Sequence, residues 1–299
     1  MSIQHILAPF QSSNESAWIA IDLAEALQLQ GMTPALWSTE TPHPIFARYG
    51  INAIRPYQGK VPANTALTVI GTEVVIGNWY ESTQFESITL LNHKFKPSGF
   101  NRIMHRLTMQ GIKQVELQYT NLQLSEKIGL PGRLIELPFN PDRVFKKEVE
   151  SKRAQIGFAL GVMTSDDISH HHPDDLALYQ RLADSGVSVK IYGGICLKQW
   201  LGGIKNIELL AQVDNSHLVE ILPLLDCIYF NNPPTSTEGP SQCMMAAIHM
   251  KLPIIAFAGG GYAQTVKQYG KGILFNNQQE AFVSILNSNQ SNIITANLC

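Results

Sequence analysis

Short apolar runs alternate with amphipathic helical segments along almost the whole chain, and this alternation restricts the fold more than any other feature. The apolar runs 3–10, 33–39 and 66–71 have the length of buried strands, whereas residues 17–31 show the periodicity of a helix. Buried strands that alternate with helices across short loops are typical of a parallel sheet covered by helices. The sequence therefore predicts an α/β fold built from doubly wound parallel sheets.

The same pattern starts a second time after a polar, charged segment at residues 138–153. Domains commonly have about 150 residues, so a chain of 299 residues has room for two domains that each bury a core. The polar segment is the best candidate for the linker between them. We expect two Rossmann-like domains, at residues 1–150 and 151–299.

Charge and cysteine usage exclude several classes of protein. The net charge is −2 and charged residues make up only 15% of the chain, so the basic excess of a nucleic-acid-binding protein is missing. The cysteines form no CxxC pair and lie in or beside apolar runs, as buried thiols in a reducing compartment do. The first residues lack the basic flank of a signal peptide, and no window has the roughly 20 apolar residues of a membrane span. We expect a cytoplasmic protein with no nucleic-acid partner.

Two loops that each follow an apolar run carry the residues best suited to bind a ligand. EGPSQ, at 238–242, leads into a short helical pattern, and GGGYAQTV, at 259–266, leads into another. Ligands of open parallel sheets bind beyond the carboxyl ends of the strands. Helix N-termini bind phosphate there, glycines allow close approach, and a carboxylate such as Glu238 suits sugar hydroxyls. The loops predict a nucleotide-sugar site, unless the glycines only form turns and Glu238 is a solvated helix-start acid.

These loops also resemble a known family. EGPSQCMMAAIHMKLPII, at 238–255, resembles without gaps the donor-site segment EGFGLPxLEAMAxGxPVI of retaining, two-domain (GT-B) glycosyltransferases. The following residues, to Val266, resemble the family's VIASDxGGxxEVV, and VKIYGG, at 189–194, is similar to a strand that ends near the nucleobase. In the first half of the chain, SITLLNHKF is similar to the strand that ends in an acceptor-side histidine, here His93. The resemblance is good over about residues 155–285 and weaker before them.

The resemblance implies two Rossmann-like domains that face each other across a cleft, with a metal-independent reaction and no cofactor. The substrate would be a nucleotide-diphosphate sugar, and the acceptor a hydroxyl of a glycan, a polysaccharide or a lipid-linked glycan. The implied catalytic residues are His93 and Glu238. The implied donor-binding residues are Gly193, Gly194, Gly239, Pro240, Ser241, Gln242, Gly259, Gly260 and Gly261.

Three residues after the first predicted strand complete the set of candidates. Ser12, Ser13 and Asn14 stand where an acceptor-side loop would lie, and they could equally be an ordinary helix cap.

Several departures from the family's pattern favour a second interpretation. Ala246 replaces a second glutamate that normally meets the ribose, and Pro240 lacks an amide hydrogen for the diphosphate. Gln264 stands where a glutamate is common, and the loop after residue 163 lacks the family's arginine and lysine. These departures leave open a non-catalytic GT-B-like subunit that binds or regulates a partner.

Two further segments have alternative interpretations. His170, His171 and His172 precede a helix start, and adjacent histidines point in different directions, so we expect no metal there. A role near the donor phosphates is the alternative. The segment 93–113 carries cations without an acid, on one face of an amphipathic helix. It predicts a solvated face, an anionic acceptor, or peripheral contact with the inner face of a membrane.

Overall fold

A computed structural model describes residues 3–109, 115–145, 157–231, 240–270 and 272–296. The chain divides into two compact units. The first unit comprises residues 1–140 with 237–242, and the second comprises residues 141–236 with 243–299. The predicted domain boundary at residue 150 lies outside the described residues, and it stays a prediction.

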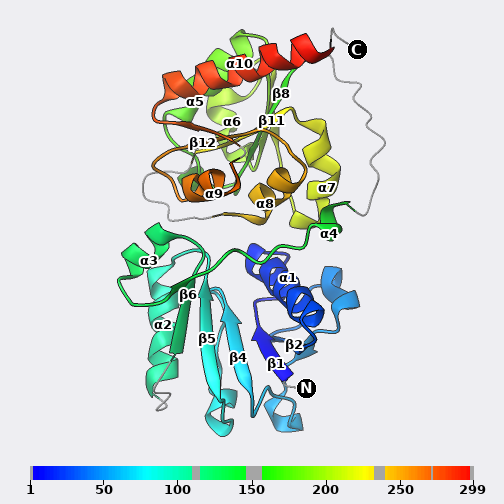
Figure 1. The fold of residues 1–299 in the computed structure, drawn as a ribbon, viewed down its shortest axis with the longest axis vertical. Helices are drawn as coiled ribbons and strands as arrows, with labels where there is room; N and C mark the ends of the chain where they lie inside the picture. Colours follow the sequence, from blue (N-terminus) through cyan, green and yellow to red (C-terminus); the bar gives the residue numbers. More distant parts are fainter. Residues whose placement is uncertain (1–2, 110–114, 146–156, 232–239, 271, 297–299) are drawn as a thin grey trace. The chain divides into compact units, whose positions relative to one another are not determined.

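The first unit contains a seven-stranded parallel sheet in the order β3-β2-β1-β4-β5-β6-β7. Its strands are β1 (Ile3–Leu7), β2 (Thr33–Ser38), β3 (Asn52–Ala53), β4 (Ala66–Ile70), β5 (Ser87–Asn92), β6 (Val115–Tyr119) and β7 (Arg133–Leu134). Its α-helices are α1 (Glu15–Leu29), α2 (Pro97–Met109) and α3 (Leu122–Ile128). Short 3-10 helices occupy Pro44–Tyr49, Pro56–Gln58 and Asn78–Ser82. Figure 1 shows α1 running along β1 and β2.

The second unit contains a six-stranded parallel sheet in the order β10-β9-β8-β11-β12-β13. Its strands are β8 (Ala159–Met163), β9 (Ser188–Tyr192), β10 (Ile207–Leu210), β11 (Cys227–Phe230), β12 (Ile254–Phe257) and β13 (Ile273–Phe275). Its α-helices are α4 (Asp142–Phe145), α5 (Asp175–Asp184), α6 (Lys198–Leu201), α7 (Leu218–Ile221), α8 (Gln242–His249), α9 (Tyr262–Tyr269) and α10 (Gln278–Ala296). Single 3-10 turns occupy Ile168–His170, Ile195–Leu197, Asn215–His217 and Leu222–Leu224. The two sheets confirm the predicted α/β fold with doubly wound parallel strands.

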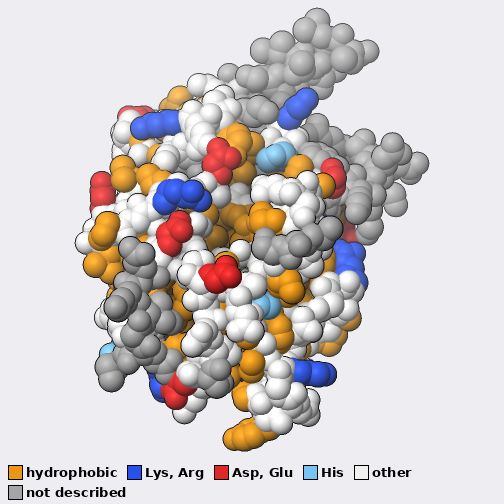
Figure 2. Space-filling view, turned by 60° about the horizontal axis from the view of Figure 1, so that its bottom comes forward, with side chains coloured by type: hydrophobic (Ala, Val, Ile, Leu, Met, Phe, Trp, Pro, Cys, Tyr) orange, Lys and Arg blue, Asp and Glu red, His pale blue; other side chains and the backbone are white. Residues whose placement is uncertain are grey.

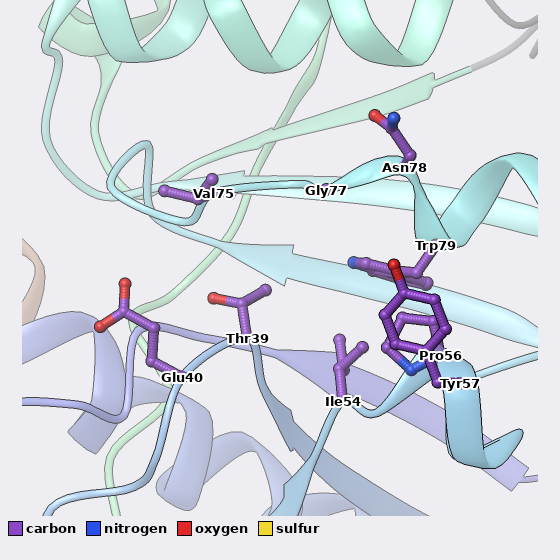
Figure 3. Close-up of a pocket in the computed structure, with 9 residues that line it drawn as sticks. All are labelled: Thr39, Glu40, Ile54, Pro56, Tyr57, Val75, Gly77, Asn78 and Trp79. Atoms are coloured by element: carbon purple, nitrogen blue, oxygen red, sulfur yellow. The ribbon is translucent and has the colours of Figure 1, made fainter.

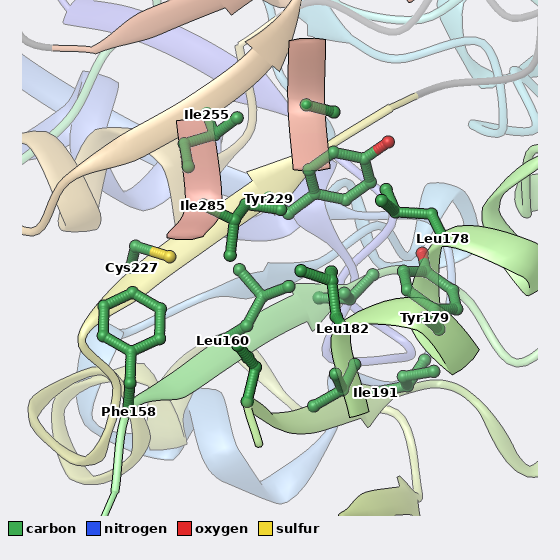
Figure 4. Close-up of a cluster of buried hydrophobic side chains, with 14 of the residues drawn as sticks. Phe158, Leu160, Leu178, Tyr179, Leu182, Ile191, Cys227, Tyr229, Ile255 and Ile285 are labelled. Atoms are coloured by element: carbon green, nitrogen blue, oxygen red, sulfur yellow. The ribbon is translucent and has the colours of Figure 1, made fainter. Parts of the chain in front are cut away.

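Each unit buries its own apolar core. In the second unit, Leu160, Ile191, Tyr229 and Ile255 come from four neighbouring strands and pack together (Figure 4). Helices α5 and α10 add further side chains, among them Ile285. The near-continuous apolar strands of the sequence are therefore buried on the sheet, as parallel strands usually are.

Two elements that the sequence pattern favours are shorter in the structure. The apolar spacing of 217–225 predicts one helix, but α7 ends at Ile221 and a 3-10 turn contains Pro223, whose missing amide hydrogen cannot continue the helix. The apolar run 133–139 predicts a strand, but it pairs only through Arg133 and Leu134, followed by one bond from the Ile135 amide to the Tyr119 carbonyl. Strand β6 ends at Tyr119, so the following residues have no strand to pair with.

The topology decides where a ligand would bind. The chain leaves β1 toward β2 and β3 and then returns to β4 on the other side of β1. In the second unit it leaves β8 toward β9 and β10 and returns to β11. Such reversals open a crevice beyond the carboxyl ends of the strands. Among the described helices, none is long and apolar enough to span a membrane.

Candidate functional site

His93 follows the last residue of β5, and its ring is buried against the start of α1. The Nε2 atom lies 2.7 Å from Oγ of Ser16, in the first turn of α1. The Nδ1 atom lies 3.6 Å from a carboxylate oxygen of Glu15. The β5 and β1 ends of the sheet are therefore joined by side chains at the carboxyl edge, with the end of β4 between them.

Gly71, which follows β4, makes room for this contact. Its φ of +78° is in the left-handed region, and a Cβ atom there would stand 2.5 Å from the Ser16 hydroxyl and 3.6 Å from Nε2 of His93. Any side chain at residue 71 would displace Ser16 from His93. The glycine is thus required both by its backbone conformation and by the close approach of its neighbours.

The His93 imidazole is neutral near physiological pH. Burial, and to a lesser extent the charge of Lys94, lower its pKa to about 3, while Glu73 opposes them. Because Nδ1 faces the Glu15 carboxylate, we assign the single ring proton to Nδ1. The Ser16 hydroxyl then donates its hydrogen bond to Nε2. The contact with Glu15 is consequently a polar contact of a neutral ring and not an ion pair.

The structure places the predicted acceptor-side residues around the same helix start. Asn14 caps α1, since its side-chain oxygen accepts a hydrogen bond from the Ala17 amide. Ser13 accepts a hydrogen bond from the indole of Trp18, whereas Ser12 is exposed. Asn14 and Ser13 thus make the contacts expected of an ordinary helix cap. Their acceptor role stays a prediction.

Sequence reasoning missed Glu15 and Ser16. The Glu15 side chain is 28% exposed, whereas the His93 side chain is 1% exposed. Glu15 is therefore the more accessible member of this cluster, although one of its carboxylate oxygens already accepts the Gln242 amide hydrogen at 3.0 Å. The available signal was its position, an acid in the first helical turn directly after a polar loop at the end of a predicted strand.

The basic segment after His93 has an acidic partner from elsewhere in the chain. Glu73, in the loop after β4, lies 3.3 Å from Nζ of Lys94 and 2.7 Å from Nζ of Lys96. Burial alone would raise the pKa of Glu73, but the two lysines outweigh burial and lower it. The cations of the segment are therefore partly neutralised, and Lys113 lies outside the described residues. On the face in Figure 2, charged side chains of both signs are scattered singly among neutral ones.

In the second unit, the Gly193–Gly194 turn is held tightly by protein contacts. Both amides donate to the Leu210 carbonyl, at 2.9 and 3.1 Å. Gly193 has a φ of +80°, and a Cβ atom would stand 2.1 Å from the Thr164 carbonyl oxygen. These glycines are thus required by the turn itself. A ligand could approach them closely, but both amides are already occupied.

The three histidines do not act as a group. The Nε2 atom of His171 donates to the Gly193 carbonyl at 2.9 Å, so this hydrogen bond stabilises the glycine turn. Burial lowers the pKa of His171, although the bond to Gly193 opposes the shift. Within the described parts of the chain, no three His, Cys, Asp or Glu side chains are placed to share a metal ion.

The turn at 259–261 offers the clearest approach for a ligand. Gly260 donates its amide to the Phe257 carbonyl at 3.1 Å, and Gly261 is the N-cap of α9. A Cβ atom on Gly259 would stand 2.8 Å from the Phe257 ring, but one on Gly260 would have no neighbour nearer than 3.4 Å. The fold therefore does not require a glycine at residue 260, and its role in donor binding stays a prediction.

The predicted donor loop is described only from residue 240 onward. Glu238 and Gly239 lie outside the described residues. Pro240 and Gln242 are buried, Ser241 is half-buried, and α8 begins at Gln242. Ala246 is fully buried within α8, so this position offers no carboxylate.

The loop after β8 carries acids where the family has cations. A carboxylate oxygen of Asp166 accepts the Cys196 amide hydrogen at 2.8 Å, and Asp167 accepts the Ser169 amide hydrogen at 2.9 Å. Asp166 thus connects the loop to the turn at 195–197, and Asp167 caps the turn at 168–170.

The carboxylate of Asp175 is buried and accepts hydrogen bonds from several elements of the second unit. One oxygen of Asp175 accepts hydrogen bonds from Tyr229 at 2.9 Å, Asn231 at 2.8 Å and Gln278 at 2.7 Å. The other oxygen accepts one from Tyr179 at 3.2 Å. Burial raises the pKa of Asp175, although its amide and hydroxyl donors oppose the shift. The sequence predicts Asp175 as a helix-start acid, but its carboxylate lies in the core and fixes the end of β11.

The comparisons with known proteins concern the fold. No protein-family model and no curated protein matches the sequence. A solved glycosyltransferase from Rickettsia africae is similar at a TM-score of 0.65 and 12% identity, over 96% of this chain and 87% of that one. HepE from Anabaena, solved with UDP, is similar at 0.67 and 13%, over 98% and 91%. WaaG, a glycosyltransferase involved in lipopolysaccharide biosynthesis, is similar at 0.63 and 11%, over 96% and 90%. The chain has the two-domain α/β fold of the GT-B glycosyltransferases.

Proposed function

We propose that the protein is a glycosyltransferase that moves a sugar from a nucleotide-diphosphate sugar to a hydroxyl acceptor, with retention and without a metal. The observation that carries the proposal is the fold, which 96% of this chain shares with a solved glycosyltransferase and 98% shares with a protein solved with UDP. A fold alone does not determine an activity. The loops at the carboxyl ends of the strands supply the second support.

In the second unit, Gly260 and Gly261 stand at the start of α9, where the helix dipole favours a diphosphate. This favourable end of a helix substitutes for the metal ion that other enzymes place beside phosphates. Glu238 accepts hydrogen bonds from hydroxyls of the donor sugar, and Ser241 lies close to it in the chain. Retention follows from the likeness of 238–255 to the retaining family.

In the first unit, His93 acts as a positioning residue for Glu15. The ring is buried and fixed by Ser16, so it holds the Glu15 carboxylate at the carboxyl edge of the sheet. The carboxylate accepts hydrogen bonds from a substrate hydroxyl. The acceptor is a glycan, a polysaccharide or a lipid-linked glycan, in the cytoplasm. Peripheral contact with a membrane has less support, because Glu73 partly neutralises the basic segment.

The test measures donor binding and turnover separately. Thermal unfolding is followed with UDP, GDP and TDP compounds, since a ligand of the native state raises the melting temperature. Hydrolysis of the corresponding nucleotide sugars is then followed with and without candidate acceptors. We expect UDP compounds to give the largest shift, and the UDP sugar that binds to be turned over. A chain that none of these compounds stabilises is not a glycosyltransferase.

The second candidate function is a non-catalytic subunit that binds or regulates a partner. It is favoured by Ala246, which offers no carboxylate for a ribose, and by the acids Asp166 and Asp167 in the loop after β8. This function predicts that UDP compounds bind without any turnover of the donor sugar.

A further inference from the structure

A pocket of about 550 Å³ opens in the first unit, apart from the His93 cluster. Its walls come from the segments that follow β2, β3 and β4 (Figure 3). It therefore lies at the carboxyl edge of the sheet, beside the point where the strand order reverses. Its volume lies within the roughly 300–1,000 Å³ range of small-molecule sites.

The lining combines apolar surfaces with three polar side chains, of which one is negatively charged and two are neutral. Trp79 forms a buried wall at 5% exposure, and Tyr57 stands fully exposed at the rim. Thr39, Glu40 and Asn78 supply a hydroxyl, a carboxylate and an amide. In Figure 3 the two aromatic side chains gather at one end and Glu40 lies toward the other. Among the residues that the structure describes, no lysine or arginine lines the pocket.

The exposed ring of Tyr57 is presented by a stiff turn. Arg55 and Lys60 exchange two backbone hydrogen bonds, at 2.8 and 3.1 Å. Inside this bridge, the Gly59 amide donates to the Pro56 carbonyl at 3.0 Å, and Gly59 has a φ of +67°. The turn is therefore fixed before any ligand arrives. The turn fixes the backbone that carries the exposed Tyr57 ring. A ligand can therefore bind against this ring at a low entropic cost.

We propose that this pocket binds a neutral pyranose ring of the acceptor, which lays its apolar face on Tyr57 and donates hydroxyl hydrogens to Glu40. The Asn78 side-chain oxygen already accepts a hydrogen bond from Arg106 at 3.3 Å, which leaves its amide nitrogen as the group that can donate. The inference rests on the proposed function, and it adds the place at which a sugar ring of the acceptor is recognised.

The charge of the lining argues against other ligand classes. A phosphate or a nucleotide would meet the Glu40 carboxylate, which is the one charged side chain among the described lining residues. The nearest cation on the Asn78 side, Arg106, is already bonded to Asn78 and does not line the pocket. A lipid chain would cover Glu40 and Thr39 without offering their side chains a hydrogen bond, and burying such groups unpaired is costly. A pyranose ring satisfies both sides of the pocket, because it has an apolar C–H face and hydroxyls around its edge.

The experiment titrates the full chain with methyl glycosides of glucose, galactose, mannose and N-acetylglucosamine, using saturation-transfer NMR and tryptophan fluorescence. We expect at least one glycoside to bind, with an affinity that falls at least tenfold in Tyr57→Ala and about fivefold in Glu40→Gln. Tyr57 is fully exposed, so its removal leaves the fold intact. Leu29→Ala is the matched control, since Leu29 is 90% exposed at the end of α1 and does not line the pocket.

Three results would overturn the inference: no glycoside binds, binding is unchanged in Tyr57→Ala, or glucose 1-phosphate binds more tightly than methyl glucoside. Thermal shifts with UDP are measured on the same proteins. We expect Tyr57→Ala to keep the wild-type shift, because none of the described residues of the proposed donor loops, 240–242 and 259–261, lines the pocket. If wild type binds no glycoside but keeps its UDP shift, the pocket alone is refuted. If wild type shows no shift with UDP, GDP or TDP compounds, the proposed function is refuted.

Discussion

The Oγ atom of Ser16 lies 2.7 Å from Nε2 of His93, although 77 positions separate the two residues in the chain. The contact joins the start of α1 to the end of β5, across the end of β4. It holds a neutral imidazole beside Glu15, and it fixes the start of α1 relative to the end of β5. Two predictions concern this cluster.

The first concerns the pH dependence of stability. The pKa of His93 is lowered to about 3 in the folded chain, from an ordinary 6.5, so below pH 6.5 only the unfolded chain takes up this proton. Stability is therefore full above pH 6.5 and falls by about 1.4 kcal/mol per pH unit as the pH drops toward 3. His93→Gln removes this contribution and should flatten the slope between pH 6.5 and 5.

Urea unfolding checks this prediction, followed by tryptophan fluorescence, which reports mainly the first unit because Trp18, Trp37 and Trp79 lie in it. His5 and His171, whose pKa values are also lowered, contribute equally to both proteins. Equal slopes for wild type and His93→Gln would show that His93 is not neutral and buried as described.

The second prediction compares two glycines that have similar backbones and different surroundings. Gly71 (φ +78°) and Gly50 (φ +64°) both adopt the left-handed conformation, but a Cβ atom meets Ser16 at Gly71 and open space at Gly50. Alanine should cost about 1 kcal/mol at Gly50, from the backbone alone. Gly71→Ala should cost clearly more and lower turnover, since it displaces Ser16 from His93. Equal losses of melting temperature and activity would contradict the role of Gly71.

Gly260→Ala probes the proposed diphosphate contact without disturbing the fold. The nearest atom to the added methyl would be 3.4 Å away and the backbone is not left-handed, so the melting temperature should stay within a few degrees of wild type. Affinity for UDP compounds should fall at least tenfold, because the methyl occupies the space of the ligand. The readout is the UDP-induced thermal shift. An unchanged shift would remove residue 260 from the donor site.

Glu238→Gln tests the proposed contact with the donor sugar. A hydrogen bond to a charged group contributes about 1.5–3 kcal/mol, so turnover should fall by roughly tenfold or more. Steady-state kinetics with the UDP sugar that binds gives the answer, and circular dichroism confirms an intact fold. Unchanged turnover would exclude Glu238 from catalysis.

Asp175→Asn should destabilise the second unit by about 2–4 kcal/mol. The substitution places an amide hydrogen among groups that donate to the carboxylate, and it leaves buried donors of Tyr229, Asn231 and Gln278 without a full set of partners. The control is Asp184→Asn, at the other end of the same helix, where the carboxylate is exposed. Equal urea midpoints for the two variants would show that the hydrogen bonds of Asp175 add no stability.

Sequence patterns predicted the parallel α/β sheets because apolar runs such as 66–71 and 87–93 form mostly buried strands. They missed β3 (Asn52–Ala53), whose two residues carry no periodicity and pair only because β2 lies beside them. In the candidate site, local sequence placed His93 at a strand end. It did not show that Ser16 and Glu15 meet it, because that contact depends on the order of strands in the sheet. The Glu73 partner of Lys94 was missed for the same reason.

The Asp175 network also has a consequence for synthesis of the protein. Its four partners include Gln278, and the core around Leu160 includes Ile285 of α10. A ribosome-bound chain can form β8 early, but the buried carboxylate then lacks a donor and the core lacks one wall until α10 has emerged from the exit tunnel. We therefore expect the second unit to close only after α10 has been synthesised, and nascent chains that stop before residue 278 to be substrates for chaperones and proteases.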